Sequence, residues 1–151
     1  MAGYYKAPEA TARDFKGGWF HTGDLAVVHP DGYIELRDRR RDIIIQGGEH
    51  FSSIEVEQTL CHHPAVAEAA VVGVPDATEG EVSKAFVVLQ PGAKVTAHEL
   101  ILFCREHLAS FKCPSHVEFI SKLPRTPTGK LQKFLLREQE WAGREKRIHG
   151  V

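Results

Sequence analysis

The segment Val66–Cys104 reads VAEAAVVGVPDATEGEVSKAFVVLQPGAKVTAHELILFC and carries most of the information about the fold. Two runs rich in valine and phenylalanine, Val66–Val74 and Val82–Leu89, have the composition of strands. The stretches PDATEGE and PGAKVT that follow them are typical of turns. Thr96 then stands three residues before Glu99, a capping box that predicts the start of an amphipathic helix. The segment therefore predicts two strands followed by a helix.

The residues on either side extend this pattern. Upstream, the apolar triplet Ile43–Ile45 predicts a strand, and Ser52 with Glu55 forms a second capping box before a second amphipathic helix. Downstream, His116–Ile120 predicts another strand. The order strand, helix, strand, strand, helix, strand is typical of a small α+β domain with helices packed on a mixed three-stranded sheet.

The first part of the chain, Met1–Asp38, predicts different elements. The residues PEATARDF, Pro8–Phe15, form a short helix candidate with proline in its first turn. Asp31-Gly32 predicts the turn of a hairpin between Ala26–His29 and Tyr33–Leu36. The charged run RDRRRD then separates this hairpin from the apolar triplet, so we place a joint at Arg39–Arg41.

Composition limits the classes of function. The chain has 151 residues, 42% apolar and 26% charged, with a formal net charge of -1, which favours one domain or one domain plus a piece of another. Such a charge gives no general attraction to nucleic acid, and apolar runs such as AAVVGV are too short for a membrane span. We expect a cytoplasmic protein.

The three cysteines, Cys61, Cys104 and Cys113, show no CxxC pairing. Their apolar or helical surroundings predict reduced packing residues, and we expect no structural metal.

The stretch LPRTPTGKLQK, Leu123–Lys133, places a lysine after two prolines and a glycine. It predicts a stiff loop ending in Gly129, followed by a helix over Leu131–Glu138, with Lys130 at their junction. Lys130 is then either a cation presented to a ligand or a solvated surface lysine.

Two other stretches have a composition that suits a ligand. In GWFHTGD, Asp24 follows Thr22-Gly23 at the end of a short strand, where its carboxylate either accepts two hydroxyl donors or bonds its own backbone. In DRRRDIIIQGGEHFSS, Arg39 has the planar fork that grips a ribose or phosphate, and Gly47-Gly48 permits close approach to a bound molecule. A solvated basic linker and a glycine turn explain this second stretch equally well from the residues alone.

Four ordered stretches resemble one family. GWFHTGD, DRRRDIIIQGGEHFSSIEVE, HPAVAEAAVVGVPD and LPRTPTGKLQK are similar to the last third of the adenylate-forming enzymes, which include acyl-CoA synthetases, adenylation domains of peptide synthetases and firefly luciferase. The resemblance runs from GYYKAPEAT to about Glu140. Within the family, the sequences of the second and fourth stretches resemble those of the medium- and long-chain fatty-acid CoA ligases.

The resemblance implies a role for each candidate residue. Asp24 would hold the ribose hydroxyls of the nucleotide, and Arg39 would also reach it. Arg41 occupies the hinge position, where the family commonly has Asp or Lys. Gly47 and Gly48 would line the tunnel for the pantetheine arm of coenzyme A. Lys130 would bridge the substrate carboxylate and the α-phosphate of ATP.

The resemblance also implies a division of the chain. Residues 1–38 would be the tail of a large AMP-binding domain, 39–42 the hinge, 43–140 the small C-terminal domain and 141–151 a terminal tail. The chain lacks the glycine- and serine-rich phosphate loop of the family, so we expect a fragment whose N-terminal AMP-binding domain is missing and which is inactive alone. His50 stands where relatives often have Asn or Arg.

By resemblance, the parent enzyme would join a medium- or long-chain fatty acid to coenzyme A, using ATP and Mg²⁺ and releasing AMP and pyrophosphate. One alternative is an adenylation unit that loads a carrier protein. Another is a stand-alone binding module without catalysis.

Overall fold

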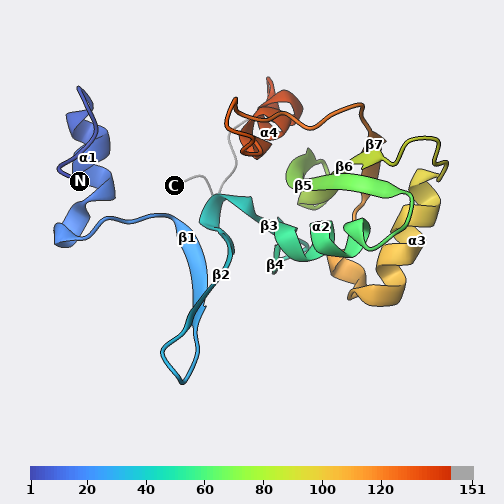
Figure 1. Cartoon of the computed structure of the whole chain (residues 1–151), viewed down its shortest axis with the longest axis horizontal. Coiled ribbons are helices and arrows are strands. Elements are labelled where there is room, and N and C mark those ends of the chain that lie inside the picture. Colours follow the sequence, from blue (N-terminus) through green and yellow to red (C-terminus); the bar gives the residue numbers. More distant parts are fainter. Residues whose placement is uncertain (144–151) are drawn as a thin grey trace. The chain divides into compact units, whose positions relative to one another are not determined.

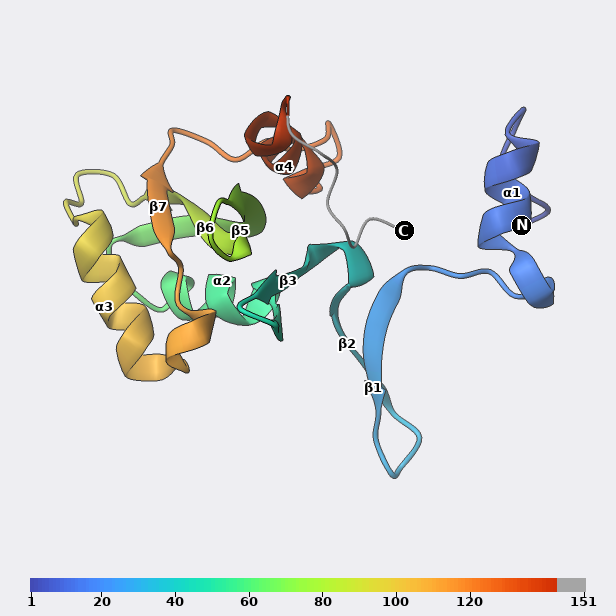
Figure 2. The same ribbon diagram turned by 180° about the vertical axis from the view of Figure 1, so that it is seen from behind.

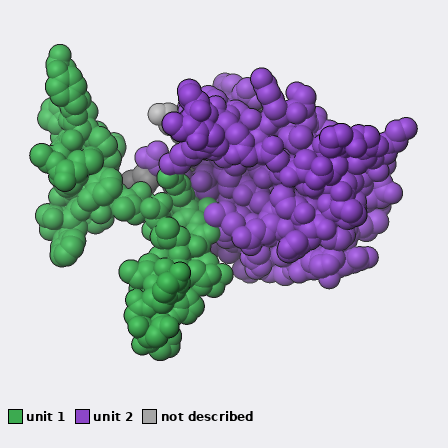
Figure 3. Space-filling model, viewed as in Figure 1, with its two compact units in different colours: residues 1–40 green, residues 41–151 purple. Residues whose placement is uncertain are grey.

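The computed structural model describes residues 1–143. It divides the chain into two compact units, Met1–Arg40 and Arg41–Val151, which are coloured separately in Figure 3. Of the expected terminal tail 141–151, residues 144–151 lie outside the described residues.

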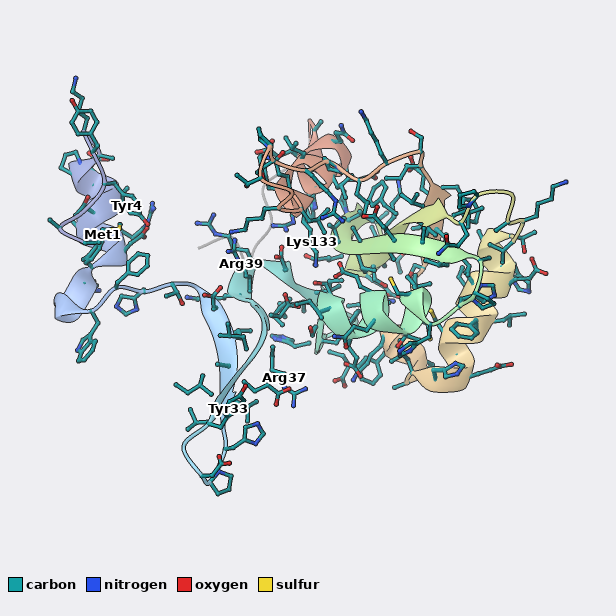
Figure 4. All side chains as sticks on the ribbon, in the orientation of Figure 1. Met1, Tyr4, Tyr33, Arg37, Arg39 and Lys133 are labelled. Atoms are coloured by element: carbon teal, nitrogen blue, oxygen red, sulfur yellow. The ribbon has the colours of Figure 1, made fainter. Side chains whose placement is uncertain are left out.

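Unit 1, residues 1–40, holds one short α-helix, a 3₁₀ turn at Lys16–Gly18 and one hairpin. The helix α1 spans Pro8–Asp14, and the hairpin pairs β1, Asp24–Val28, with β2, Ile34–Arg39, in antiparallel register. At the turn, the Asp31 carboxylate accepts the N–H of Tyr33, and Gly32 has a φ of 85°, a value that glycine adopts without strain. The predicted hairpin is therefore confirmed, with Tyr33 near its end in Figure 4.

Unit 2 carries the remaining elements, which Figures 1 and 2 show from opposite sides. In chain order its strands and α-helices are β3 Ile43–Gln46, β4 Glu49–Ser52, α2 Ser53–Cys61, β5 Val66–Asp76, β6 Gly80–Leu89, α3 Ala97–His107, β7 His116–Phe119 and α4 Lys133–Trp141. A 3₁₀ turn, Ser110–Lys112, lies between α3 and β7.

The central sheet has the order β5-β6-β7. β5 and β6 are antiparallel, whereas β6 and β7 are parallel and are joined by the crossover through α3. This confirms the α+β fold with a mixed three-stranded sheet.

Successive side chains of β5 point to opposite faces of the sheet, and both faces are buried. Val71 and its neighbour Ala69 pack with α2 and α3, while Ala70 and Val72 pack with Leu136 of α4. Helices accordingly cover both faces of the sheet, with α2 and α3 on one side and α4 on the other (Figure 1).

The two capping predictions had different outcomes. At α3, Thr96 and Glu99 form the complete box, and bonds from the backbone and hydroxyl of Thr96 lower the pKa of the Glu99 carboxyl. At α2, the Ser52 hydroxyl accepts the N–H of Ile54, whereas the Glu55 carboxylate receives two 2.8 Å bonds from Lys112 Nζ. The capping box predicted at α2 is therefore confirmed for Ser52 only. Glu55 does not complete it, because a tertiary ion pair holds this carboxylate.

Two element boundaries differ from the prediction. Glu49–Ser52 forms the strand β4, which sequence reasoning missed, and it pairs with β3 through a two-residue turn. The last helix begins at Lys133 and not at Leu131, because Leu131 forms an isolated β-bridge with Arg125.

Candidate functional site

Lys130 lies on a closed loop of unit 2. The β-bridge between Arg125 and Leu131 joins the two ends of this loop. Within it, the Thr126 N–H donates to the Lys130 carbonyl at 2.8 Å, and the Lys130 N–H donates to the Thr126 hydroxyl at 3.0 Å. Gly129 turns the chain with a φ of 87° and donates its N–H to the Thr126 carbonyl at 2.8 Å. Thr126 thus bonds both the carbonyl and the N–H of the Lys130 backbone.

The side chain of Lys130 is exposed. Within residues 1–143, its ammonium group makes no ion pair and no hydrogen bond with another side chain. A fixed backbone with an exposed ammonium group is the arrangement that presents a cation to a ligand.

The candidate residues Asp24 and Arg39 come together in unit 1. They are directly opposite each other in the hairpin, and Arg39 Nε lies 3.5 Å from Asp24 Oδ1. The Asp24 N–H donates to the Thr22 hydroxyl at 3.1 Å. Asp24 is the first residue of β1, not the end of a strand, which corrects the prediction. The Arg39 side chain is 56% exposed and the Asp24 side chain 33%, so each retains hydrogen-bonding capacity toward a ligand.

Gly47 and Gly48 form the two-residue turn between β3 and β4. Their φ values of 58° and 86° are the positive values that both central residues of a type I′ turn require. A Cβ atom built on either glycine meets no other atom within 4 Å, so the tip of the hairpin is open. His50 is exposed on β4 opposite Ile45.

Gln46 fixes the base of this hairpin to the central sheet. Its Oε1 accepts the N–H of Ser83 at 3.0 Å and the Ser83 hydroxyl at 3.2 Å, while its Nε2 donates to the Ser115 hydroxyl at 3.3 Å. Ser83 on β6 is fully buried. Sequence reasoning missed Gln46, since a lone glutamine before two glycines gives no signal of its distant partners.

Arg41 is exposed in the short 3₁₀ turn Arg40–Asp42 that links the hairpin of unit 1 to β3. Its neighbour Asp42 forms an ion pair with Arg137 of α4, and both side chains are mostly buried. This pair ties the start of unit 2 to its last helix.

The described cysteines differ in environment. Cys104 and Cys113 are buried, and burial raises the pKa of the Cys104 thiol to about 12. Cys61 is exposed at the end of α2, so its prediction as a packing residue was wrong. Across residues 1–143, no group of three or more His, Cys, Asp or Glu side chains is arranged to hold a metal ion. Among the helices of the same residues, none combines the length and the hydrophobicity that a membrane span requires.

Comparison with a family model decides the family. The model described as the C-terminal domain of AMP-binding enzymes matches residues 55–130, half of the chain. The chain belongs to this family.

Individual members of the AMP-binding family match a longer stretch. A 4-hydroxybutyrate–CoA ligase of Metallosphaera sedula is 56% identical over 137 residues, which are 91% of this chain and 25% of the relative. A peroxisomal trans-cinnamate:CoA ligase of Petunia hybrida is 49% identical over 138 residues, 91% of this chain and 24% of the relative. The chain therefore spans about a quarter of the length of these curated relatives.

A solved structure supports the same fold. ATP-bound MatB from Rhodopseudomonas palustris superposes with a TM-score of 0.85 at 38% identity, covering 91% of this chain and 27% of the MatB chain. The match extends the family assignment to most of the three-dimensional structure.

Proposed function

We propose that this chain is the C-terminal portion of an ATP-dependent acid–thiol ligase, which converts a carboxylic acid, ATP and coenzyme A into acyl-CoA, AMP and pyrophosphate. The observation that carries the proposal is the Lys130 loop. Thr126 bonds the backbone of Lys130 on both sides, while the ammonium group is exposed and makes no ion pair within residues 1–143. Its surroundings suit a cation that acts on an external ligand.

Lys130 would act in the first half-reaction. When a carboxylate attacks the α-phosphate of ATP, negative charge builds on oxygens that repel one another. A fixed cation aimed at these oxygens stabilises the transition state. An ammonium group on a long, flexible stem can also enter and leave the site with a moving domain.

Asp24 and Arg39 would bind the nucleotide. A carboxylate can accept two hydroxyl donors, which suits the ribose, and the guanidinium 3.5 Å away holds its orientation while keeping donors for the nucleotide. The fit is limited to the ribose side of ATP, because this chain has no phosphate loop.

Gly47 and Gly48 would serve the second half-reaction. The open tip of their turn suits close passage of the pantetheine arm of coenzyme A. Arg41, within the hinge 39–42, would let residues 43–140 turn between the two half-reactions against an N-terminal domain to which residues 1–38 belong.

Mg²⁺ would be held through the phosphate oxygens of ATP. Residues 1–143 offer no cluster of carboxylates for it, and magnesium is often bound through substrate phosphates. It would neutralise phosphate charge, and no side chain described here is assigned to it.

The acid is proposed to be a medium- or long-chain fatty acid on the resemblance of two motifs alone. The two relatives named above differ in their acid, since one is a 4-hydroxybutyrate ligase and the other a trans-cinnamate ligase. Yet each of these enzymes is about half identical to this chain over the matched residues. Selectivity for the acid would therefore reside outside this portion. The cytoplasm is the proposed location, although the trans-cinnamate ligase is peroxisomal.

A hybrid enzyme tests the proposal. The 4-hydroxybutyrate–CoA ligase of Metallosphaera sedula would receive this chain in place of its own matching quarter. We expect ATP-dependent formation of 4-hydroxybutyryl-CoA by the hybrid, and no exchange of pyrophosphate into ATP by the 151-residue chain alone.

The control is the relative truncated before the exchanged segment. A folded hybrid no more active than this truncated protein would overturn the proposal in favour of a stand-alone binding module. Transfer to a carrier protein but not to coenzyme A would favour the carrier-loading alternative.

A further inference from the structure

The motif TGKLQK contains two lysines three residues apart, and their environments are opposite. Lys130 is exposed, whereas the side chain of Lys133, marked in Figure 4, is only 11% exposed. Lys133 Nζ lies 2.6 Å from Glu57 Oε1 and 2.8 Å from the hydroxyl of Ser53. The second lysine of the motif is therefore committed to partners within the fold.

The partners of Lys133 are themselves firmly placed. Glu57 is 14% exposed, and its Oε1 also accepts the backbone N–H of Val71 on β5 at 2.7 Å. Ser53 is fully buried and is the first residue of α2, directly after the strand β4. Lys133 thus connects α4 to α2, to the central sheet and to the hairpin that carries Gly47-Gly48.

Capping signals do not explain why α4 begins at Lys133. Its N-cap residue Gln132 makes no side-chain cap, and the first turn contains no acidic residue. A lysine at this end also opposes the helix dipole, which favours negative charge there. The carboxylate of Glu57 and the hydroxyl of Ser53 compensate for this lysine, so a tertiary contact supports the helix start that follows the Arg125–Leu131 bridge.

The Lys130 loop, residues 125–131, is flanked by two apolar anchors and two ion pairs. Leu123 and Leu131 pack in the cluster around Leu136. At the first end, Arg125 pairs with Glu68 on β5, but these side chains are 44% and 42% exposed, so water and salt screen the attraction. Two residues beyond the second end, Lys133 pairs with Glu57 in a mostly buried setting, where screening is weaker. Of the two ion pairs, the buried one is the firmer attachment.

We propose that Lys133 is a positioning residue for Lys130. It holds the C-terminal end of the loop at a set place relative to α2 and the β3–β4 hairpin, so the surfaces used in the two half-reactions move as one body. The role in catalysis rests on the proposed function. The positioning itself is a property of this chain alone.

The first test uses the 151-residue chain and needs no activity. Backbone order parameters from NMR relaxation would be compared for Thr126, Gly129 and Lys130. We expect K133M and E57Q to lower them from about 0.85 toward 0.6, the range that separates rigid from flexible backbone. K133R should restore part of the order, because it retains the charge.

E68Q is the matched control, since it removes the exposed ion pair at the other end while Arg125 keeps its bond to the Gly129 carbonyl at 2.9 Å. Its order parameters should match those of the unmodified chain. Unchanged order at Lys130 in folded K133M or E57Q overturns the proposal, and so does an equal loss in E68Q. If K133M fails to fold, E57Q gives the answer.

The second test uses the hybrid ligase. K133M should lower kcat for adenylation by roughly ten- to a hundred-fold, as expected for a misplaced catalytic group, and leave the KM for ATP within about twofold. In a K130A background, K133M should change adenylation by less than about twofold, because it acts through Lys130. An undiminished further loss in that background would show a merely structural role and overturn the proposal. An inactive hybrid would count against the proposed function and leave the NMR result standing.

Discussion

At the scale of single residues, chemical type alone does not separate a candidate catalytic group from a structural one. Lys130 and Lys133 occur in one motif, yet among the residues that the structure describes a carboxylate holds Lys133 and none holds Lys130. The same holds for the two capping carboxylates, of which Glu99 caps its helix and Glu55 pairs with Lys112. The partner decides the role.

Lys130→Ala should separate the half-reactions of the hybrid ligase. Adenylation should fall by roughly a hundred- to a thousand-fold, the loss typical when one aimed electrostatic contact is removed. The thioester step, started from ready-made acyl-adenylate, should be largely spared, because the proposed domain movement turns Lys130 away. Pyrophosphate exchange and acyl-CoA formation measure the two steps. Lys122→Ala, at an exposed lysine before the loop, is the control. Equal slowing of both steps would contradict the role assigned to Lys130.

At the scale of elements, the β3–β4 hairpin combines a fixed base with an open tip. Gln46 bonds the base to Ser83 on the central sheet, and the two glycines at the tip have positive φ values. A substitution at the tip therefore has two separable effects, strain in the turn and a side chain in the open space.

Gly48→Leu should impair thioester formation and spare adenylation, because the side chain would obstruct the pantetheine arm. A φ of 86° also strains leucine, so Gly48→Leu changes both the backbone and the space at the tip. Gly47→Asn is the matched variant that separates these two effects. Asparagine followed by glycine is a preferred type I′ pair, so this variant adds a smaller side chain with little strain. Both half-reactions and the melting temperature would be measured. Normal thioester formation in a folded Gly48→Leu variant would contradict the tunnel assignment.

At the scale of the whole molecule, the two units differ in how much apolar surface they bury. Every buried apolar side chain of the described residues lies in unit 2, whereas Asp38 is the one buried residue of unit 1. Trp19 is 80% exposed, and Ile34 and Leu36 are also exposed. A surface of this kind is typical of a segment that packs on another domain.

We therefore expect unit 1 to open more readily than unit 2 in the isolated chain. Its hairpin has no apolar core of its own, and local stability follows such burial. Hydrogen exchange would compare the amides of Trp19–Leu36 with those of Val82–Leu89, in a sample shown to be monomeric. Equal protection of the two segments in this monomeric sample would contradict the expectation.

The sequence by itself determined the type and order of most elements, because hydrophobic alternation, capping residues and turn residues act locally. Val66–Val74 and Val82–Leu89 are recognisable strands in any context, and the four ordered motifs sufficed to identify the family. Only the tertiary structure decided the partners of Gln46 and Lys133. Gln46 bonds Ser83, 37 positions away, and Lys133 bonds Ser53, 80 positions away. Local pattern contains no information about such pairings, because they form only when the packed sheet brings distant segments together.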